Sequence, residues 1–141
     1  MQIVVFKLGE EFFGVETLNV QNISEMMEIT KIPNAPSYIK GLINLRGNII
    51  SLLDLNLLLE NNHLTSEQSN VIILDIESEQ IGITVDFVQE VIELEETTMQ
   101  KLDSSKGQGY IKGILNLEDK IVSIIDINKL REKHGRGFIS K

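Results

Sequence analysis

The chain has 141 residues, enough for about one domain with a sizeable core, and carries a formal net charge of −8 at pH 7. This negative charge repels a phosphate backbone, and the aromatic residues, 5% of the chain without Trp, are too scattered to stack bases. We therefore expect no nucleic-acid partner. Because cysteine is absent, disulfides, thiolate metal sites and a cysteine nucleophile are excluded, and packing must supply the stability.

The N-terminus lacks a basic start followed by a long apolar stretch, as a secretory signal would have. No segment reaches the roughly 20 apolar residues that a membrane span needs. We expect a cytoplasmic protein with no direct membrane insertion.

Short segments rich in β-branched residues, with roughly alternating polarity, fill most of the chain and predict strands. In the first part they lie at 2–8, 12–17, 23–32, 39–46 and 48–55. In the second part they lie at 70–77, 80–86, 88–95, 110–117 and 120–127. Helix is confined to single turns at 57–60 and 129–133, for which Asn56 and Asn128 are suitable N-caps.

The second part repeats the first. Residues 38–58 read YIKGLINLRGNIISLLDLNLL, and residues 110–130 read YIKGILNLEDKIVSIIDINKL, an offset of 72. Upstream the offset is 68, and the difference falls in the Ser/Gly-rich stretch 104–109. The chain is therefore an internal duplication, with its seam in the polar run 60–69.

A duplicated chain of short strands predicts two small closed barrels, because closure removes edge strands that would otherwise aggregate. We expect a single domain over 1–141, made of a first barrel at about 1–59, a second at about 70–128, and a C-terminal helix and tail at about 129–141. The strand at 48–55 is apolar on both faces, so something dry must cover its second face. That cover is the other copy or a partner protein.

The sequence offers little chemistry. Asp54 and Asp126 follow equivalent apolar strands, but the Gly-rich turn that would pair their carboxylates is missing, so we interpret them as turn and helix-cap residues. His63 and His134 have no acid beside them that would make a ligand or base. No phosphate loop or hydrolase motif occurs. We predict no enzyme activity, no catalytic residue, no metal site and no cofactor.

The segments VVFKLGEEFFGVETLNVQNI (4–23) and ITKIPNAPSYIKGLINLRGNIISLLDL (29–55) resemble the CheW family of bacterial chemotaxis adaptors in motif and order, over nearly all of residues 2–132. The resemblance implies an all-β fold of two five-stranded SH3-like barrels, related by a pseudo-twofold, with one or two short helices. It also implies an adaptor without catalytic activity, which couples the cytoplasmic tip of methyl-accepting chemoreceptors to the regulatory domain of the histidine kinase CheA.

The family pattern also implies a receptor-binding groove. Its residues match Val20, Gly41 and Arg46, with Val91 as the second-barrel position. Asn22 stands where relatives often carry glutamate, so one charged contact to the receptor is lost or moved.

The first copy has Arg46-Gly47 at this turn, and the second copy has Glu118-Asp119 at the equivalent place. A guanidinium can donate as a planar fork to carbonyls or a carboxylate on a receptor helix, or it can tie down its own hairpin. Gly41 and Gly113 recur, which indicates a backbone requirement, either positive φ or close approach.

Alternatives remain. The chain could be a CheW-like module of a CheV-type protein or of a CheA kinase, which would require a receiver domain or a kinase core next to it; the ends of this sequence argue against both. A generic SH3-like peptide-binding module would predict a groove rich in aromatic residues, which are few in this chain.

Overall fold

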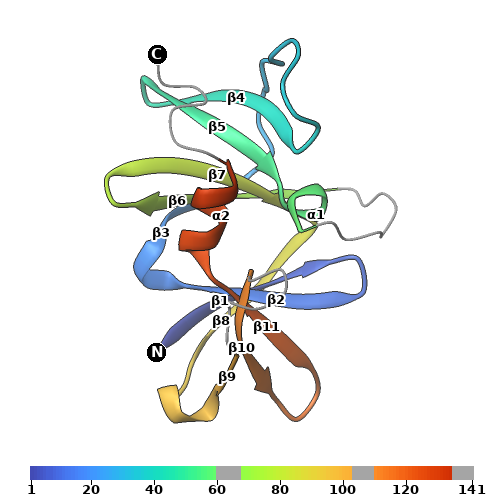
Figure 1. Cartoon of the computed structure of the whole chain (residues 1–141), viewed down its shortest axis with the longest axis vertical. Coiled ribbons are helices and arrows are strands. Elements are labelled where there is room, and N and C mark those ends of the chain that lie inside the picture. Colours follow the sequence, from blue (N-terminus) through green and yellow to red (C-terminus); the bar gives the residue numbers. More distant parts are fainter. Residues whose placement is uncertain (60–67, 103–109, 135–141) are drawn as a thin grey trace.

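The computed structural model describes residues 1–59, 68–102 and 110–134, and most of these form strands (Figure 1). The first copy contains β1 (Gln2–Leu8), β2 (Glu11–Glu16), β3 (Val20–Glu25), β4 (Ile39–Leu45) and β5 (Asn48–Asp54). The second contains β6 (Asn70–Ile76), β7 (Glu79–Val85), β8 (Phe87–Glu93), β9 (Gln100–Lys101), β10 (Ile111–Asn116) and β11 (Ile121–Ile125). The helical elements are α1 (Leu55–Leu58), α2 (Ile127–His134) and the 3₁₀ turns η1 (Thr17–Asn19) and η2 (Glu96–Thr98).

The predicted all-β class with two short helices is confirmed, and each predicted strand has a counterpart. The prediction for 23–32 was wrong in extent, since β3 begins earlier and ends at Glu25. Beyond it, Met26 and Ile29 pack into an apolar cluster, and only Thr30 pairs again, with Leu42. Neither α-helix in the described residues has the length and apolar character of a membrane-spanning segment.

The strands form two sheets that exchange hairpins between the copies. One sheet has the order β8-β1-β2-β11-β10-β9, and the other has the order β3-β6-β7-β5-β4. The hairpin β1-β2 therefore lies among strands of the second copy, and β6-β7 lies among strands of the first. The predicted barrels at about 1–59 and 70–128 were thus wrong as contiguous units, because each sheet takes strands from both.

Parallel strand pairs join the exchanged hairpins to their hosts. β2 runs parallel to β11 through Phe12↔Val122 and Gly14↔Ile124, and β7 runs parallel to β5 through Gly82↔Leu52. The neighbouring pairs within each sheet are antiparallel. Since the two copies have similar sequences, the sequence pattern does not show whether a hairpin pairs within its own copy or with the other.

The sheets are curled but not closed, which corrects the prediction of closed barrels. In the β3–β4 sheet, β3 and β4 are opposite edges. The chain leaving β3 crosses to the other edge, where Thr30 and Leu42 exchange backbone hydrogen bonds of 2.9 and 2.8 Å. In the other sheet, β9 follows β8 in the same way and pairs with β10. The connecting segment, rather than direct pairing of the edge strands, completes each curl.

The core is divided into a shared layer and two smaller interiors. The shared layer lies between the sheets and takes residues from both, including Val4, Phe6, Leu53 and Ile83, all less than 2% exposed. Each curl encloses its own cluster, one around Ile3 and Val5 and one around Ile50 and Leu52. β5 thus has one face in its own curl and the other in the shared layer. Packing between the copies covers its second face.

The exchanged hairpins predict that neither half of the chain folds alone. Fragments produced by a cut between residues 63 and 64 should each lack a cooperative unfolding transition, because each sheet would lose two of its central strands. Mixing the fragments should restore the circular dichroism spectrum and the transition of the intact chain. A cooperative transition in either fragment alone would contradict this topology.

Candidate protein-docking site

The β4-β5 hairpin carries Arg46 at its tip. Arg46 and Gly47 have φ of 54° and 87°, so both turn residues are left-handed, as a tight two-residue hairpin requires. Asn44 Oδ1 accepts a 2.9 Å hydrogen bond from Gly47 N and holds the turn. Arg46 is exposed, and within the described residues its guanidinium has no hydrogen bond or ion pair. Asn44, not Arg46, therefore ties down the hairpin.

Gly41 lies at a bulge in β4, where the register to β5 shifts between Ile39 and Gly41. Its φ is +149°, and an added Cβ would lie 2.3 Å from the carbonyl oxygen of Thr30. The bulge thus brings β4 against the segment that returns from β3. Gly113, its equivalent, also lies at a bulge, but an added Cβ there would meet the flexible side chain of Met99, at 2.4 Å from Sδ. The expected backbone requirement is therefore stricter at Gly41.

Gly41→Ala should cost more stability than Gly113→Ala. At Gly41 the new methyl group meets backbone and a disfavoured φ, so we expect a loss above about 2 kcal/mol in the free energy of unfolding. At Gly113 Met99 can move, so we expect about 1 kcal/mol or less. Urea unfolding of both variants provides the measurement. Equal losses would show that the two bulges are constrained alike.

The candidate receptor-binding residues divide between the sheets. Val20 and Asn22 lie half-buried on β3, and Gly41 lies in the same cross-strand row as Asn22 at the opposite edge, through Ile73, Gly82 and Leu52. Arg46 follows on the β4-β5 turn, at the end of the sheet where β3 begins and β6 ends. Val91 is 50% exposed but lies on β8 in the other sheet. The structure thus brings four of the five onto one sheet.

We call the part of the sheet from the row of Asn22 to this turn, with Val20, Asn22, Arg46 and Asn48, the Arg46 end. Beside it, a groove is lined on β4, β5 and the returning segment by Met27, Glu28, Thr30, Leu42, Ile43, Asn44 and Ile49. Ile49 is 58% exposed. The arrangement combines an exposed apolar side chain, a groove and an unpartnered cation, which suits protein docking rather than bond-breaking chemistry.

The equivalent end of the other sheet is built differently, which sequence reasoning missed. Lys120 occupies the place of Asn48, yet its side chain is only 8% exposed. Its Nζ lies 2.9 Å from Glu90 Oε2 and 3.3 Å from Asp119 Oδ2, and 5.5 Å from the centre of the Phe12 ring. The hydrogen bond to Glu90, more than the coulombic attraction of both acids, raises the pKa of Lys120 above its ordinary value of 10.5.

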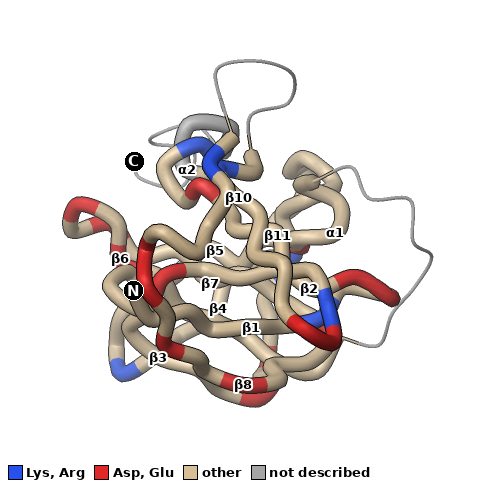
Figure 2. The backbone as a smooth tube through the Cα atoms, turned by 90° about the horizontal axis from the view of Figure 1, so that it is seen from below, with Lys and Arg blue, Asp and Glu red and all other residues tan. Residues whose placement is uncertain are grey.

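A signal for this cluster was present in the sequence. Asn48 is replaced by Lys120 in the same copy in which Asn22 is replaced by Glu90, a paired change of neutral residues to opposite charges. Acidic residues lie on several separate segments around the molecule, including β8 and the β10-β11 region (Figure 2). Only the curl of the sheet brings this particular acid and base together.

The Lys120 pair should stabilise the fold only while Lys120 is protonated. Because its pKa is raised in the folded state, its contribution is complete below 10.5 and is lost as pH rises above that value. The difference in unfolding free energy between the unmodified protein and Lys120→Met should therefore shrink at alkaline pH. Urea unfolding from about pH 8 to 11 measures it, with Lys101→Met at an exposed site as control. A difference that stays constant would contradict the ion pair.

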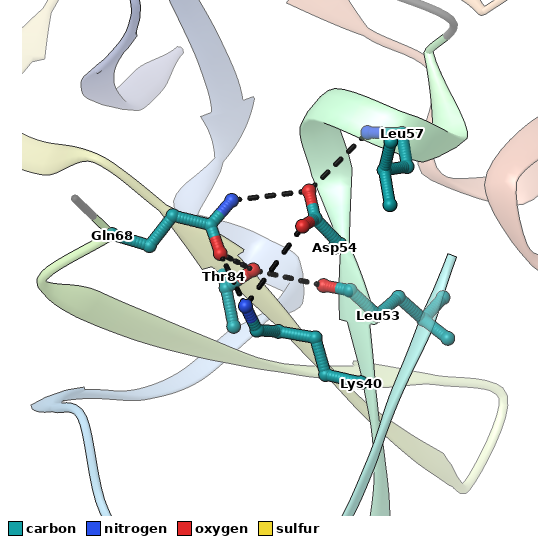
Figure 3. Close-up of polar contacts among 6 residues, drawn as sticks. All are labelled: Lys40, Leu53, Asp54, Leu57, Gln68 and Thr84. Atoms are coloured by element: carbon teal, nitrogen blue, oxygen red, sulfur yellow. Dashed lines mark hydrogen bonds and ion pairs between the residues drawn. The ribbon is translucent and has the colours of Figure 1, made fainter. Parts of the chain in front are cut away.

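Asp54 lies in a polar cluster at the opposite end of the sheet (Figure 3). Its Oδ1 accepts hydrogen bonds from Leu57 N, at 3.2 Å, and from Gln68 Nε2, at 3.0 Å. Gln68 Oε1 in turn accepts from Lys40 Nζ, at 3.0 Å, and from Thr84 Oγ1, at 2.9 Å. The cluster joins the β4 bulge, the start of α1 and the strand β7, and so holds the sheet rather than a substrate.

The interpretation of Asp54 as a helix cap is confirmed, since its carboxylate caps α1. Asp126 makes a similar contact one residue earlier in its helix, since its carboxylate accepts from Asn128 N at 3.1 Å. The two aspartates therefore hold separate helices at the ends of different sheets. Asn56 was the wrong cap, because α1 begins one residue before it and buries it. α2 likewise begins at Ile127, before Asn128.

Comparison with known proteins agrees with this geometry. A profile of the family described as "CheW-like domain" matches residues 2–134. "Chemotaxis protein CheW" of Treponema pallidum is 30% identical over 137 residues, covering 92% of this chain and 81% of that protein. The protein of the same name from Klebsiella aerogenes is 30% identical over 133 residues, covering 92% and 80%. The crystal structure of the scaffolding protein TtCheW from Thermoanaerobacter tengcongensis matches with a TM-score of 0.81 and 35% identity, over 92% of this chain and 86% of that one.

Proposed function

The chain belongs to the CheW-like family, and we propose that it is a chemotaxis adaptor that couples the cytoplasmic tip of a methyl-accepting chemoreceptor to the regulatory domain of the histidine kinase CheA. In this proposal the protein works in the cytoplasm, reaches the membrane only through the receptor, and performs no catalysis. Its relatives are named as chemotaxis and scaffolding proteins, and that shared role supports the proposal.

The observation that carries the proposal is the exposure of Arg46 on a turn that Asn44 holds. An exposed guanidinium on a fixed turn, without a partner in the described part of the chain, can donate two parallel hydrogen bonds to a carboxylate of a receptor helix. Val20 and Asn22 lie at the same end of the sheet and would contact the same helix. Asn22 can donate and accept hydrogen bonds but brings no charge, so Arg46 is the ionic contact of the proposed receptor site.

An adaptor also needs room for two partners at once. The accessible surface is 8071 Å², so two patches of about 800 Å² each would occupy about a fifth of it. Modest affinity at each patch is sufficient if receptors are clustered, because avidity then strengthens the assembly. The kinase would bind outside the Arg46 end, and Val91, on the other sheet, extends the proposed receptor surface along β8.

Arg46→Glu should weaken capture of a receptor cytoplasmic fragment while leaving capture of the CheA regulatory domain intact. Loss of a charge-assisted hydrogen bond of about 1.5–3 kcal/mol corresponds to a roughly 10- to 100-fold higher Kd, and charge reversal adds repulsion. Calorimetry with each partner measures both constants. Val20→Asp should have the same selective effect by placing a charge in the proposed receptor surface.

Two controls sharpen this test. Arg46→Lys keeps the charge but loses the planar fork, so its receptor affinity should fall between those of the original protein and Arg46→Glu. Glu118→Lys changes the equivalent turn of the second copy and should leave receptor affinity unchanged. Equal loss of receptor and kinase binding in Arg46→Glu would indicate a folding defect, and unchanged receptor binding would refute the proposed site.

A further inference from the structure

Duplication gives this protein two similar sheet ends, and each is a possible docking surface. Ile49 and Ile121 are equivalent residues next to the two hairpin turns, and each is 58% exposed. A groove also lies beside each, lined by Ile49 at the first end and by Phe12, Lys120 and Ile121 at the second. Neither exposed apolar surface nor a groove therefore distinguishes the ends. The proposed function assigns the receptor's ionic contact to the Arg46 end, with Val91 on β8 as an apolar contact. The question is therefore how the two ends differ toward a receptor carboxylate.

The ends differ at three equivalent positions across the mouth of the curl. Asn22, Asn48 and Gln80 of the Arg46 end correspond to Glu90, Lys120 and Phe12 of the other. At the Arg46 end, no side-chain hydrogen bond joins Asn22 to Asn48 among the described residues, and Asn48 is exposed. At the other end, the equivalent residues meet in a 2.9 Å ion pair that spans from β8 to the β10-β11 turn.

The Lys120–Glu90 pair has further contacts with the Phe12 ring and with Asp119. Lys7 Nζ and Lys120 Nζ each lie 5.5 Å from the centre of the Phe12 ring, and Asp119 lies 3.3 Å from Lys120. The Lys120 side chain is only 8% exposed, and its ammonium group already has two carboxylate partners within the chain. Breaking the pair would leave Glu90 without its cation and would remove one of the two ammonium groups beside the ring, which opposes insertion of a partner's side chain.

We propose that the Lys120–Glu90 ion pair, seated on Phe12, satisfies the cation of the second sheet end within the chain and thereby restricts docking of a receptor carboxylate to the Arg46 end. This inference rests on the proposed function and names the residues that determine its specificity. Beside the equivalent turn, the internal pair supplies the contact between cation and carboxylate that Arg46 would make with a receptor at the other end. The receptor carboxylate is then excluded from the second end because the charged groups there already have partners within the chain, not because the two ends differ in apolar surface.

Single-cysteine probes can compare the two ends, because the chain contains no cysteine of its own. Ile49→Cys and Ile121→Cys place a thiol at equivalent positions of equal exposure. Alkylation rates are measured with and without a receptor cytoplasmic fragment at about ten times its Kd, where mass action leaves about a tenth of the sites free. The fragment should slow alkylation about tenfold at position 49 and leave position 121 unchanged.

Two further sets of substitutions, each combined with Ile121→Cys, test the ion pair itself. Glu118→Arg alone supplies the cation of the Arg46 end but leaves the pair closed, so position 121 should stay unprotected. Glu90→Asn/Glu118→Arg/Lys120→Asn also opens the pair, so position 121 should become protected, with an alkylation rate at least about threefold lower at the same occupancy. The triple variant removes both charges together, so neither is left unpaired at this partly buried site.

Each outcome decides between the alternatives. Protection of position 121 in the original protein or in Glu118→Arg alone would overturn the inference, as would a folded triple variant that stays unprotected. If the triple variant does not unfold cooperatively in urea, Glu90→Gln/Glu118→Arg/Lys120→Gln, which retains more side-chain volume, replaces it under the same criteria. Absence of protection at position 49 in the original protein would instead refute the proposed function.

Discussion

The pairing of strands from one copy with strands from the other is the constraint on which this structure depends. The parallel seams β2-β11 and β5-β7 build each hairpin into the opposite sheet, and the shared layer of apolar residues then lies between two sheets of mixed origin. Burial of this layer stabilises both copies together, since removing either would expose the other's core. A rigid body with two related but separate ends follows, which is the mechanical requirement for an adaptor.

On this common scaffold the two ends have diverged through a few polar residues. In one, Asn44 fixes a left-handed turn and leaves Arg46 without an internal partner. In the other, Lys120 is drawn inward to Glu90 and Phe12. The same hairpin thus presents a cation to solvent in the first copy and buries one in the second. Duplication followed by such exchange of charge yields an asymmetric binding protein from a nearly symmetric fold.

Much of this was accessible from the sequence, and what was missed has specific causes. Alternation of polar and apolar residues located the strands, and the exact recurrence of Tyr-Ile-Lys-Gly located the copies and indicated a backbone requirement at their glycines. The end of β3 was misplaced because Met26 and Ile29 are apolar for a core contact outside any strand. The helix caps were misplaced by two residues because Asp and Asn both favour capping. Only the geometry shows that the side chain of Asp54, rather than that of Asn56, accepts from Leu57 N.

The sequence by itself determined the strand-rich class, the duplication, the family resemblance and the position of Arg46, because these depend on local pattern and on order along the chain. Only the tertiary structure decided that the hairpins are exchanged, that the sheets remain open at their edges, and that Lys120 meets Glu90. A local sequence pattern does not show which copy a strand pairs with, because the two copies have similar patterns. The contact between Lys120 and Glu90, 30 positions apart, arises only from the curl of the sheet. Long-range geometry, not residue type, therefore distinguishes the two ends.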